Sequence, residues 1–149
     1  MGTLEEEIKK RRCSVGIIGL GHIGLPMAAV IAEKGFTVLG GDLNPHIVDA
    51  VNSKKSSVQE EGLQSLIEKG SIEGRLRATL NPSEVVKKCK IVLIVVQTPI
   101  KEDNTPDLSH LKSACLEVSK QLRSGQLIII ESTVPPGPIN EVILPIFDC

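Results

Sequence analysis

The sequence predicts an α/β fold, a doubly wound parallel sheet between two layers of helices. Apolar segments of strand length alternate with helical segments along the chain. The apolar residues are mostly Val, Ile, Leu and Ala, with two Phe and neither Trp nor Tyr, which is typical of a sheet covered on both faces. A turn of the form Gly19-x-Gly21-x-x-Gly24 joins the first strand to the first helix. Together these features predict a Rossmann-like, three-layer α/β/α domain.

The length of 149 residues is that of one domain with a sizeable core. We expect residues 1–13 to form a lead-in segment, in which the basic run 9–12 is a solvated approach to the first strand. Residues 14–149 are expected to form the domain. A Pro-rich loop at 135–138 precedes a last apolar segment, which predicts a helix that has only begun. This ending suggests a domain truncated from a longer chain.

The first unit of the predicted fold is a strand, a helix and a second strand. Residues 15–20 form an apolar run of strand type, and residues 23–32 combine apolar residues with good helix formers. Gly35 predicts the end of this helix. Residues 36–39 then start a second strand, which leads to an acidic residue, Asp42.

The alternation continues along the rest of the chain. Asn81 and Pro82 are favourable at the N-cap and first position of a helix, which predicts a short helix to Lys88. The unbroken β-branched and Leu run at 91–96 predicts a central strand buried on both faces. The other expected elements are helices at 45–53, 63–69 and 108–122, the last capped by Asp107, a short strand at 76–80, and a buried strand at 126–130.

The glycine turn has the spacing of a phosphate-binding turn. Gly19 lets the chain turn sharply, Gly21 lets a pyrophosphate approach the backbone, and Gly24 lets the helix pack closely on the strand. The helix that opens near His22 points its free N–H groups and its positive dipole end at the diphosphate. The alternative is a plain α/β core in which the glycines only form a turn.

Asp42 follows Gly19 by 23 residues and ends the second predicted strand. A carboxylate at this place accepts hydrogen bonds from both ribose hydroxyls of an adenosine, but it repels a 2′-phosphate. The sequence therefore predicts NAD rather than NADP as the cofactor.

Composition excludes several other classes of protein. The formal net charge of −1 gives no electrostatic case for binding nucleic acid or an anionic membrane surface, and no apolar stretch has the length of a membrane span. Four cysteines without a CxxC pair, and no apolar signal segment, predict a reduced, cytoplasmic protein. The three histidines and four cysteines are scattered and do not form the clustered spacing of zinc ligands, so no metal site is predicted.

Hydroxyl side chains follow two of the later strands, and ligands bind at the carboxyl ends of such strands. Thr98 and Pro99 follow the strand at 91–96, and Ser132 and Thr133 follow the strand at 126–130. Each pair taken singly is explained by turn chemistry, because such residues often satisfy loop backbone. Their position at one edge of the sheet favours a cofactor. Glu131 remains open between capping the strand and touching a ligand.

These motifs follow one another in an order and spacing that can be compared with known families: GLGHIGLP from Gly19 to Pro26, Asp42, Gln97-Thr98-Pro99, Pro106-Asp107-Leu108, and Glu131-Ser132-Thr133 before Pro136-Gly137. Over nearly the whole chain they resemble the amino-terminal domain of the UDP-glucose/GDP-mannose dehydrogenases. Within that family, residues 44–46, 75–79 and 98–101 most resemble UDP-N-acetyl-D-mannosamine dehydrogenase. The sequence departs from the usual family pattern at His22, where Tyr is common, and at Gln97, where Pro, Val or Asn is common.

The resemblance implies oxidation of a UDP-sugar C6 alcohol to a carboxylate, for polysaccharide biosynthesis, with two NAD and a thiohemiacetal on a cysteine. That cysteine and a catalytic lysine belong to family segments beyond residue 149, as do a central helix for homodimerisation and a UDP-sugar-binding domain. Thr133 matches a threonine that helps to position catalytic water. The implied cofactor-binding residues are Gly19, Gly21, His22, Ile23 and Gly24 at the diphosphate turn, Asp42 at the adenosine ribose, Thr98 and Pro99 at the other ribose, and Ser132 and Thr133 near the nicotinamide.

The 149 residues alone are therefore expected to bind NAD without turning over a sugar. Two other hypotheses are compatible with the glycine turn. One is the first domain of a β-hydroxyacid dehydrogenase, which usually lacks the Thr98-Pro99 and Glu131-Ser132-Thr133 motifs. The other is a stand-alone NAD-sensing module, which would need no hydroxyl cluster at the nicotinamide end.

Overall fold

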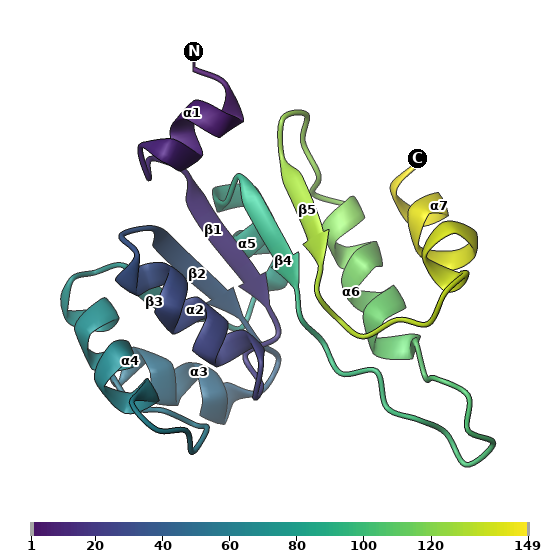
Figure 1. Ribbon diagram of the computed structural model, residues 1–149, viewed down its shortest axis with the longest axis horizontal. Helices are drawn as coiled ribbons and strands as arrows, with labels where there is room; N and C mark the ends of the chain where they lie inside the picture. The colour runs from purple at the N-terminus through teal and green to yellow at the C-terminus, as the bar shows by residue number, and fades with distance from the viewer. Residues whose placement is uncertain (1, 149) are drawn as a thin grey trace.

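The computed structural model describes residues 2–148; Met1 and Cys149, the last of the four cysteines, lie outside the described residues. One parallel sheet has the strand order β3-β2-β1-β4-β5 (Figure 1). Its strands are β1 (Ser14–Ile18), β2 (Thr37–Gly41), β3 (Leu76–Thr79), β4 (Ile91–Ile94) and β5 (Leu127–Ile130). The predicted doubly wound parallel sheet is confirmed.

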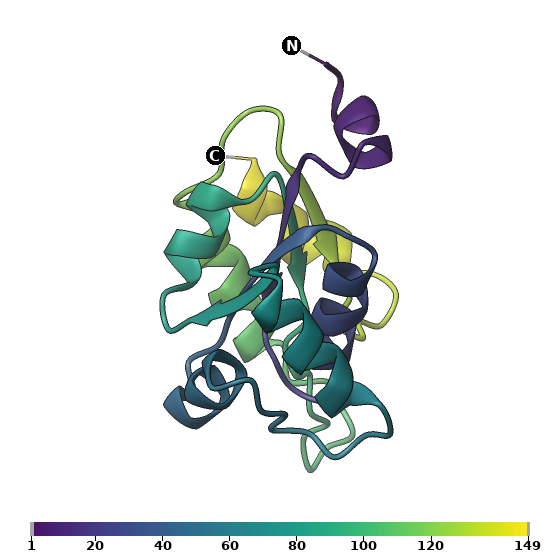
Figure 2. The same ribbon diagram turned by 90° about the vertical axis from the view of Figure 1, so that its left-hand side faces the viewer.

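Helices cover both faces of this sheet. The helices are α2 (Gly24–Glu33), α3 (Pro45–Asn52), α4 (Leu63–Ile72), α5 (Pro82–Lys88), α6 (Ser109–Ser119), a π-helical segment (Ile139–Ile143) and α7 (Leu144–Phe147), while α1 (Leu4–Lys9) lies beyond the amino end of β1 (Figure 1). Figure 2 shows α2 and α4 on one side of the sheet and α5 and α6 on the other. Each side has its own buried apolar cluster, one around Leu25 and Ile67 and the other around Val85 and Leu111. The arrangement is therefore the expected three-layer α/β/α structure.

The lead-in segment contains α1, a helix that the sequence analysis did not predict. Thr3 accepts the Glu6 N–H through its hydroxyl at 3.3 Å, and the Glu6 carboxylate accepts the Thr3 N–H at 3.2 Å. The Thr-x-x-Glu spacing is the sequence signal for such a capping box. An ion pair of 2.6 Å between Glu7 and Lys90 links the helix to the amino end of β4.

The later elements differ from prediction at their ends. β4 stops at Ile94 instead of residue 96, because the Val96 N–H bonds to the side chain of Ser132 rather than to a neighbouring strand. β5 lies at the edge of the sheet and none of its residues is fully buried, so the prediction of a buried strand was wrong. α6 is shorter than predicted, and its N-cap is Leu108 rather than the predicted Asp107. Asp107 lies one residue earlier and accepts the Ser109 N–H at 2.9 Å.

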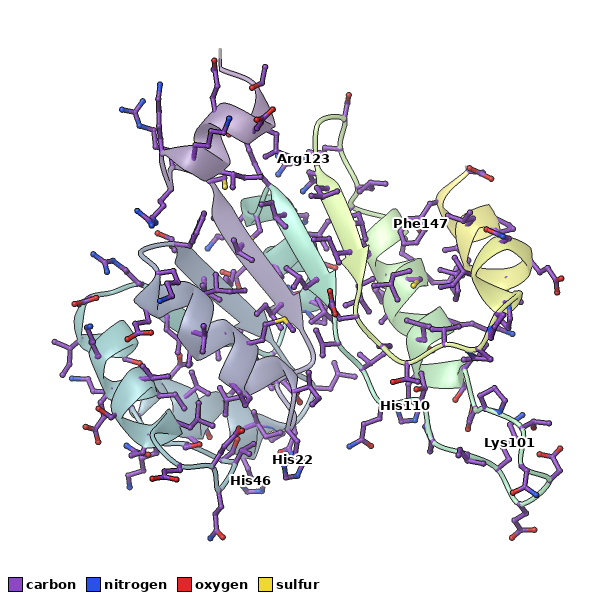
Figure 3. All side chains as sticks on the ribbon, in the orientation of Figure 1. His22, His46, Lys101, His110, Arg123 and Phe147 are labelled. Atoms are coloured by element: carbon purple, nitrogen blue, oxygen red, sulfur yellow. The ribbon has the colours of Figure 1, made fainter. Side chains whose placement is uncertain are left out.

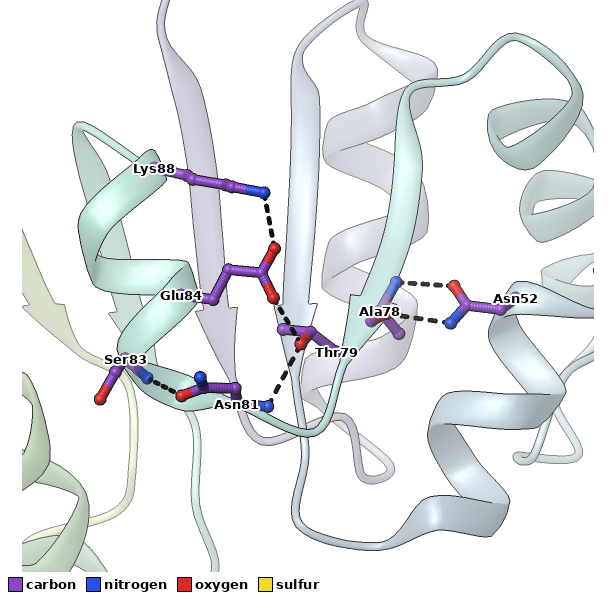
Figure 4. Close-up of polar contacts among 7 residues, drawn as sticks. All are labelled: Asn52, Ala78, Thr79, Asn81, Ser83, Glu84 and Lys88. Carbon is purple, nitrogen blue, oxygen red and sulfur yellow. Dashed lines mark hydrogen bonds and ion pairs between the residues drawn. The ribbon is translucent and has the colours of Figure 1, made fainter.

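Polar side chains fix the opposite edge of the sheet, at β3 (Figure 4). The Asn52 amide pairs with both the N–H and the C=O of Ala78, at 2.9 Å each, and so replaces a neighbouring strand. At the end of β3, Glu84 pairs with Lys88 at 2.6 Å and accepts the Thr79 hydroxyl at 2.8 Å. Hydrogen bonds from Lys88 and Thr79 lower the pKa of Glu84. The predicted N-cap Asn81 accepts the Ser83 N–H at 3.0 Å and is confirmed.

Candidate functional site

The carboxyl ends of all five strands meet on one line of the sheet. Thr79, Gly41, Ile18, Ile94 and Ile130 are successive partners in its register, and each is the last residue of its strand. In Figure 1 the arrowheads of β1, β4 and β5 point to this edge. Because β1 lies between β2 and β4, the connections diverge at the β1–β4 junction, where ligands bind in folds of this kind. Every predicted site residue follows β1, β2, β4 or β5 at this edge.

Gly19 and Gly24 have structural reasons to be glycine. Gly19 has φ +98°, and a Cβ there would lie 2.2 Å from the carbonyl oxygen of Val95. A Cβ at Gly24 would lie 1.8 Å from the carbonyl oxygen of Gly19. These two residues let the chain turn off β1 and let α2 start against the turn, as their predicted mechanical roles require.

Gly21 has no such reason. Its φ is not in the left-handed region, and a Cβ added there would meet no heavy atom of the described structure within 4 Å. A side chain at this position would instead occupy the open space in front of the turn. The position therefore fits a group that must approach the backbone closely, as the pyrophosphate of a dinucleotide does.

The beginning of α2 is suited to an anion. Its N-cap, Ile23, has no side-chain cap hydrogen bond, and the first turn contains no acidic residue. Ile23 is 64% exposed, and His22 beside it is also exposed. Figure 3 shows His22 and His46 at this edge of the molecule, away from Arg123.

Asp42 holds the glycine turn and the start of the next segment. Its Oδ2 accepts the Leu20 N–H at 2.8 Å, and its Oδ1 accepts the Asn44 N–H at 2.9 Å. The Asp42 N–H in turn donates to the carbonyl of Thr79 at 3.1 Å. Each carboxylate oxygen has a further lone pair, so the fixed carboxylate can still accept ribose hydroxyls.

The hydroxyls after β4 and β5 bond to backbone groups of the opposite segment. Ser132 Oγ accepts the Val96 N–H at 2.9 Å and donates to the Val96 carbonyl at 2.8 Å. Thr98 Oγ1 donates to the carbonyl of Thr133 at 2.8 Å. The sequence placed these residues at one edge but gave no sign that they bond to each other's segments.

A groove of about 440 Å³ lies between these two segments, lined by Thr98, Ile100, Asn104, Pro106, Thr133, Val134 and Pro135. One wall is the loop after β4, where the carbonyl of Pro99 accepts the Asp107 N–H at 2.7 Å and Ile100 pairs with Pro106. Lys101 lies on the projecting part of this loop (Figure 3). Sequence reasoning missed Ile100 and Asn104 as wall residues. A larger hollow of about 560 Å³, near Arg123 and Phe147, contains none of the predicted site residues.

The cysteines of the described chain are buried, not arranged as nucleophiles. Burial raises the pKa of Cys89 and of Cys115 to about 11, and it also raises the pKa of Cys13. Within residues 2–148, no cluster of three or more His, Cys, Asp or Glu side chains is suited to a metal ion. None of the helices in that range is both long and apolar enough to cross a membrane.

Comparisons with known proteins identify a family for the chain. The family model of the UDP-glucose/GDP-mannose dehydrogenase family, NAD binding domain, matches residues 13–149. A UDP-N-acetyl-D-mannosamine dehydrogenase of Campylobacter jejuni is 40% identical over 129 residues, which are 86% of this chain and 31% of the relative. A GDP-mannose 6-dehydrogenase of Pseudomonas syringae pv. tomato is 34% identical over 139 residues, which are 91% of this chain and 32% of the relative.

Solved structures give the same result. The crystal structure of a ternary complex of GDP-mannose dehydrogenase from Pseudomonas aeruginosa superposes with a TM-score of 0.86 at 31% identity, over 89% of this chain and 31% of that one. A UDP-N-acetyl-mannosamine dehydrogenase from Staphylococcus aureus gives a TM-score of 0.84 at 30% identity, over 90% of this chain and 32% of that one. The chain thus spans about a third of the length of the proteins it matches.

Proposed function

The chain belongs to the UDP-glucose/GDP-mannose dehydrogenase family, as its NAD binding domain, and from this premise we propose a specific reaction. The domain serves a nucleotide-sugar 6-dehydrogenase that oxidises the C6 alcohol of a UDP-sugar to the uronate with two NAD. UDP-N-acetyl-D-mannosamine is the first candidate substrate. The identity of 40% to a relative of that name, against 34% to a GDP-mannose 6-dehydrogenase, supports this choice.

The observation that best supports a dinucleotide at this edge is the open space at Gly21. Bulk would be tolerated there by the fold, so glycine is explained by the approach of a ligand. In this proposal residues 19–24 hold the diphosphate through backbone N–H groups and the dipole of α2. Asp42 holds the adenosine ribose with the lone pairs that Leu20 and Asn44 leave free.

The groove between the β4 and β5 segments takes the nicotinamide half of NAD. Thr98 accepts a ribose hydroxyl through a lone pair while donating to Thr133, and Pro99 fixes the path of the loop. Ser132 and Thr133 stand near the nicotinamide, and Thr133 is the catalytic candidate, as the residue that positions water. Bound NAD supplies the hydride acceptor for each of the two oxidations.

The sugar and the partner subunit require more of the protein than these 149 residues. The chain spans about a third of its relatives, and its buried cysteines are unsuited to act as the nucleophile. We therefore expect the 149 residues to bind NAD without oxidising a sugar. In the longer protein a UDP-sugar and a second copy of the chain are the expected partners, and the cytoplasm is the expected location.

The family match favours this function over the two alternative hypotheses. A β-hydroxyacid dehydrogenase or a stand-alone NAD-sensing module would share the glycine turn but not the match over residues 13–149. The hydroxyl groups that line or join the groove also favour an enzyme over a sensor.

The deciding experiment measures NADH yield per sugar for the protein expressed from its complete gene. UDP-N-acetylmannosamine, UDP-glucose, UDP-N-acetylglucosamine and GDP-mannose are offered in turn. About two NADH for each molecule of UDP-N-acetylmannosamine, and none with the others, is the expected result. Two NADH from another of these sugars would show that this sugar, and not UDP-N-acetylmannosamine, is the substrate. No turnover with any of the four sugars, despite intact NAD binding, would contradict the proposed reaction.

A further inference from the structure

Ser132 lies just beyond the point where β5 stops pairing with β4. The ladder ends at the pair Ile94 and Ile130, followed by a hydrogen bond of 3.0 Å from the Glu131 N–H to the carbonyl of Ile94. The Ser132 hydroxyl then accepts the Val96 N–H at 2.9 Å and donates to the Val96 carbonyl at 2.8 Å. One side chain thus supplies both partners that a continuing strand would have given to Val96.

A second link joins the same two segments in the opposite sense. The Thr98 hydroxyl, on the β4 side, donates to the carbonyl of Thr133, on the β5 side, at 2.8 Å. The two links lie two residues apart on the β4 side and one residue apart on the β5 side. Thr98 and Thr133 both line the groove, and the residues between the links are therefore tied on both sides.

Ser132 itself is not one of the residues that line this groove in the described structure. It is half-buried, and Val96 occupies its only donor and one of its two acceptor sites. This arrangement suits a residue that acts through its neighbours better than one that touches the ligand.

We propose that Ser132 is a positioning residue: its hydroxyl clamps the segments after β4 and β5 together and fixes Thr98 and Thr133 for the nicotinamide half of NAD. The inference rests on the proposed placement of NAD. Ser132 is expected to act mainly on that half, because its hydroxyl bonds to Val96, whereas the adenosine half is held by the backbone of the glycine turn and by Asp42, which accepts the Leu20 N–H. Loss of the hydroxyl therefore weakens NAD without weakening ADP, which lacks the second ribose and the nicotinamide.

The first measurement is the affinity for NAD and for ADP by calorimetry, in the protein expressed from its complete gene. Ser132→Ala is expected to weaken NAD about tenfold, the effect of one or two lost hydrogen bonds, and to change ADP affinity less than about twofold. Ser132→Thr keeps the hydroxyl and is expected to restore NAD affinity. Ser14→Ala is the matched control, because the Ser14 hydroxyl also donates to a distant carbonyl, that of Lys88 at 2.8 Å, but at the amino end of the sheet.

The second measurement separates a clamp from a direct contact. Hydrogen exchange at the Val96 amide, measured without any cofactor, is expected to be faster in Ser132→Ala and normal in Ser132→Thr. A serine that only touched NAD would leave this amide unchanged in the free protein. Because Thr98 joins the same segments, Thr98→Val and Ser132→Ala are expected to weaken NAD less than additively when combined.

The outcomes are distinct. Equal losses of NAD and ADP affinity in Ser132→Ala, or normal NAD affinity with normal Val96 exchange, would overturn the clamp while the proposed function stands. Failure of the unmodified protein to bind either ligand would overturn the proposed function and the clamp with it. Selective loss of NAD, with fast exchange at Val96 and rescue by Ser132→Thr, would support the clamp.

Discussion

The two halves of the proposed NAD site are built in different ways. On the adenosine side, the turn after β1 needs glycine at positions 19, 21 and 24, where a side chain would meet either the protein backbone or the proposed ligand. It also needs one carboxylate, that of Asp42. On the nicotinamide side, the segments after β4 and β5 depend on hydroxyls that bond to distant backbone, from Ser132 and Thr98. The first half is fixed by steric limits within one βαβ unit, and the second by cross-links between segments about 35 residues apart.

This difference predicts different responses to mutation. A steric limit is broken by adding one methyl group, and the result is lost folding or lost binding according to where the methyl points. A cross-link is broken by removing one hydroxyl, and the expected loss is the smaller net value of a hydrogen bond. The adenosine half is therefore expected to give the larger effects.

The largest expected effect is that of Gly24→Ala on folding. The new Cβ would lie 1.8 Å from the carbonyl oxygen of Gly19, a backbone atom that moves only if α2 shifts away from the turn. We expect a loss of about 3 kcal/mol in the free energy of unfolding, measured by urea denaturation. A variant as stable as the unmodified protein would show that the turn is not packed as tightly as described.

Gly21→Ala is the matched contrast, because the same methyl enters open space. We expect no change in stability beyond about 0.5 kcal/mol, but a fall in NAD affinity of about a hundredfold, near 2.7 kcal/mol, as the pyrophosphate is held away from the backbone. Calorimetry with NAD and with ADP measures it, and both ligands are expected to weaken. Unchanged affinity for both would place the diphosphate elsewhere.

The same difference explains what the sequence could predict. The glycine turn and Asp42 belong to one strand-helix-strand unit, in which spacing alone brings the residues together. The cap at Asn81 is more local still, and it was predicted correctly. The α1 helix also has a local signal, the capping box of Thr3 and Glu6. Its six residues are too few to show the amphipathic pattern that predicts a helix.

The nicotinamide half depends on which strands are neighbours in the sheet and in which register they pair, and the sequence does not specify either. Thr98 and Ser132 were predicted to lie at one edge, but their bonds to Thr133 and Val96 require β4 and β5 to be neighbours in one register. The exposure of β5 was mispredicted for the same reason. A central strand and an edge strand can have the same apolar sequence, and only the order of the strands in the sheet distinguishes them.

Asp42→Ala is expected to have an intermediate effect and to act on cofactor choice. The unmodified protein should bind NAD more tightly than NADP, because the carboxylate accepts ribose hydroxyls and repels a 2′-phosphate. In Asp42→Ala we expect NAD affinity to fall about tenfold and the gap to NADP to narrow, with a loss of about 1–2 kcal/mol in stability as Leu20 and Asn44 lose their acceptor. Calorimetry with both cofactors and urea denaturation measure these changes.

Asp49→Ala, which removes an exposed carboxylate from the nearby α3, is the control for a general change in charge. It is expected to leave both affinities unchanged. Equal affinity of the unmodified protein for NAD and NADP would contradict the role of Asp42 in selecting the cofactor.

The smallest expected effect is that of Thr98→Val, and it is the one that tests the nicotinamide half most directly. Valine keeps the shape of threonine and removes the hydroxyl that donates to Thr133 and faces the proposed ribose. We expect NAD affinity to fall about fivefold, with ADP affinity unchanged and stability within about 1 kcal/mol. Thr105→Val is the matched control on the same loop, since the Thr105 hydroxyl donates to a residue of its own loop, Asp103 at 2.5 Å. If Thr98→Val binds NAD as well as Thr105→Val does, the Thr98 hydroxyl serves the loop alone, and the two halves of the site no longer differ in the way proposed.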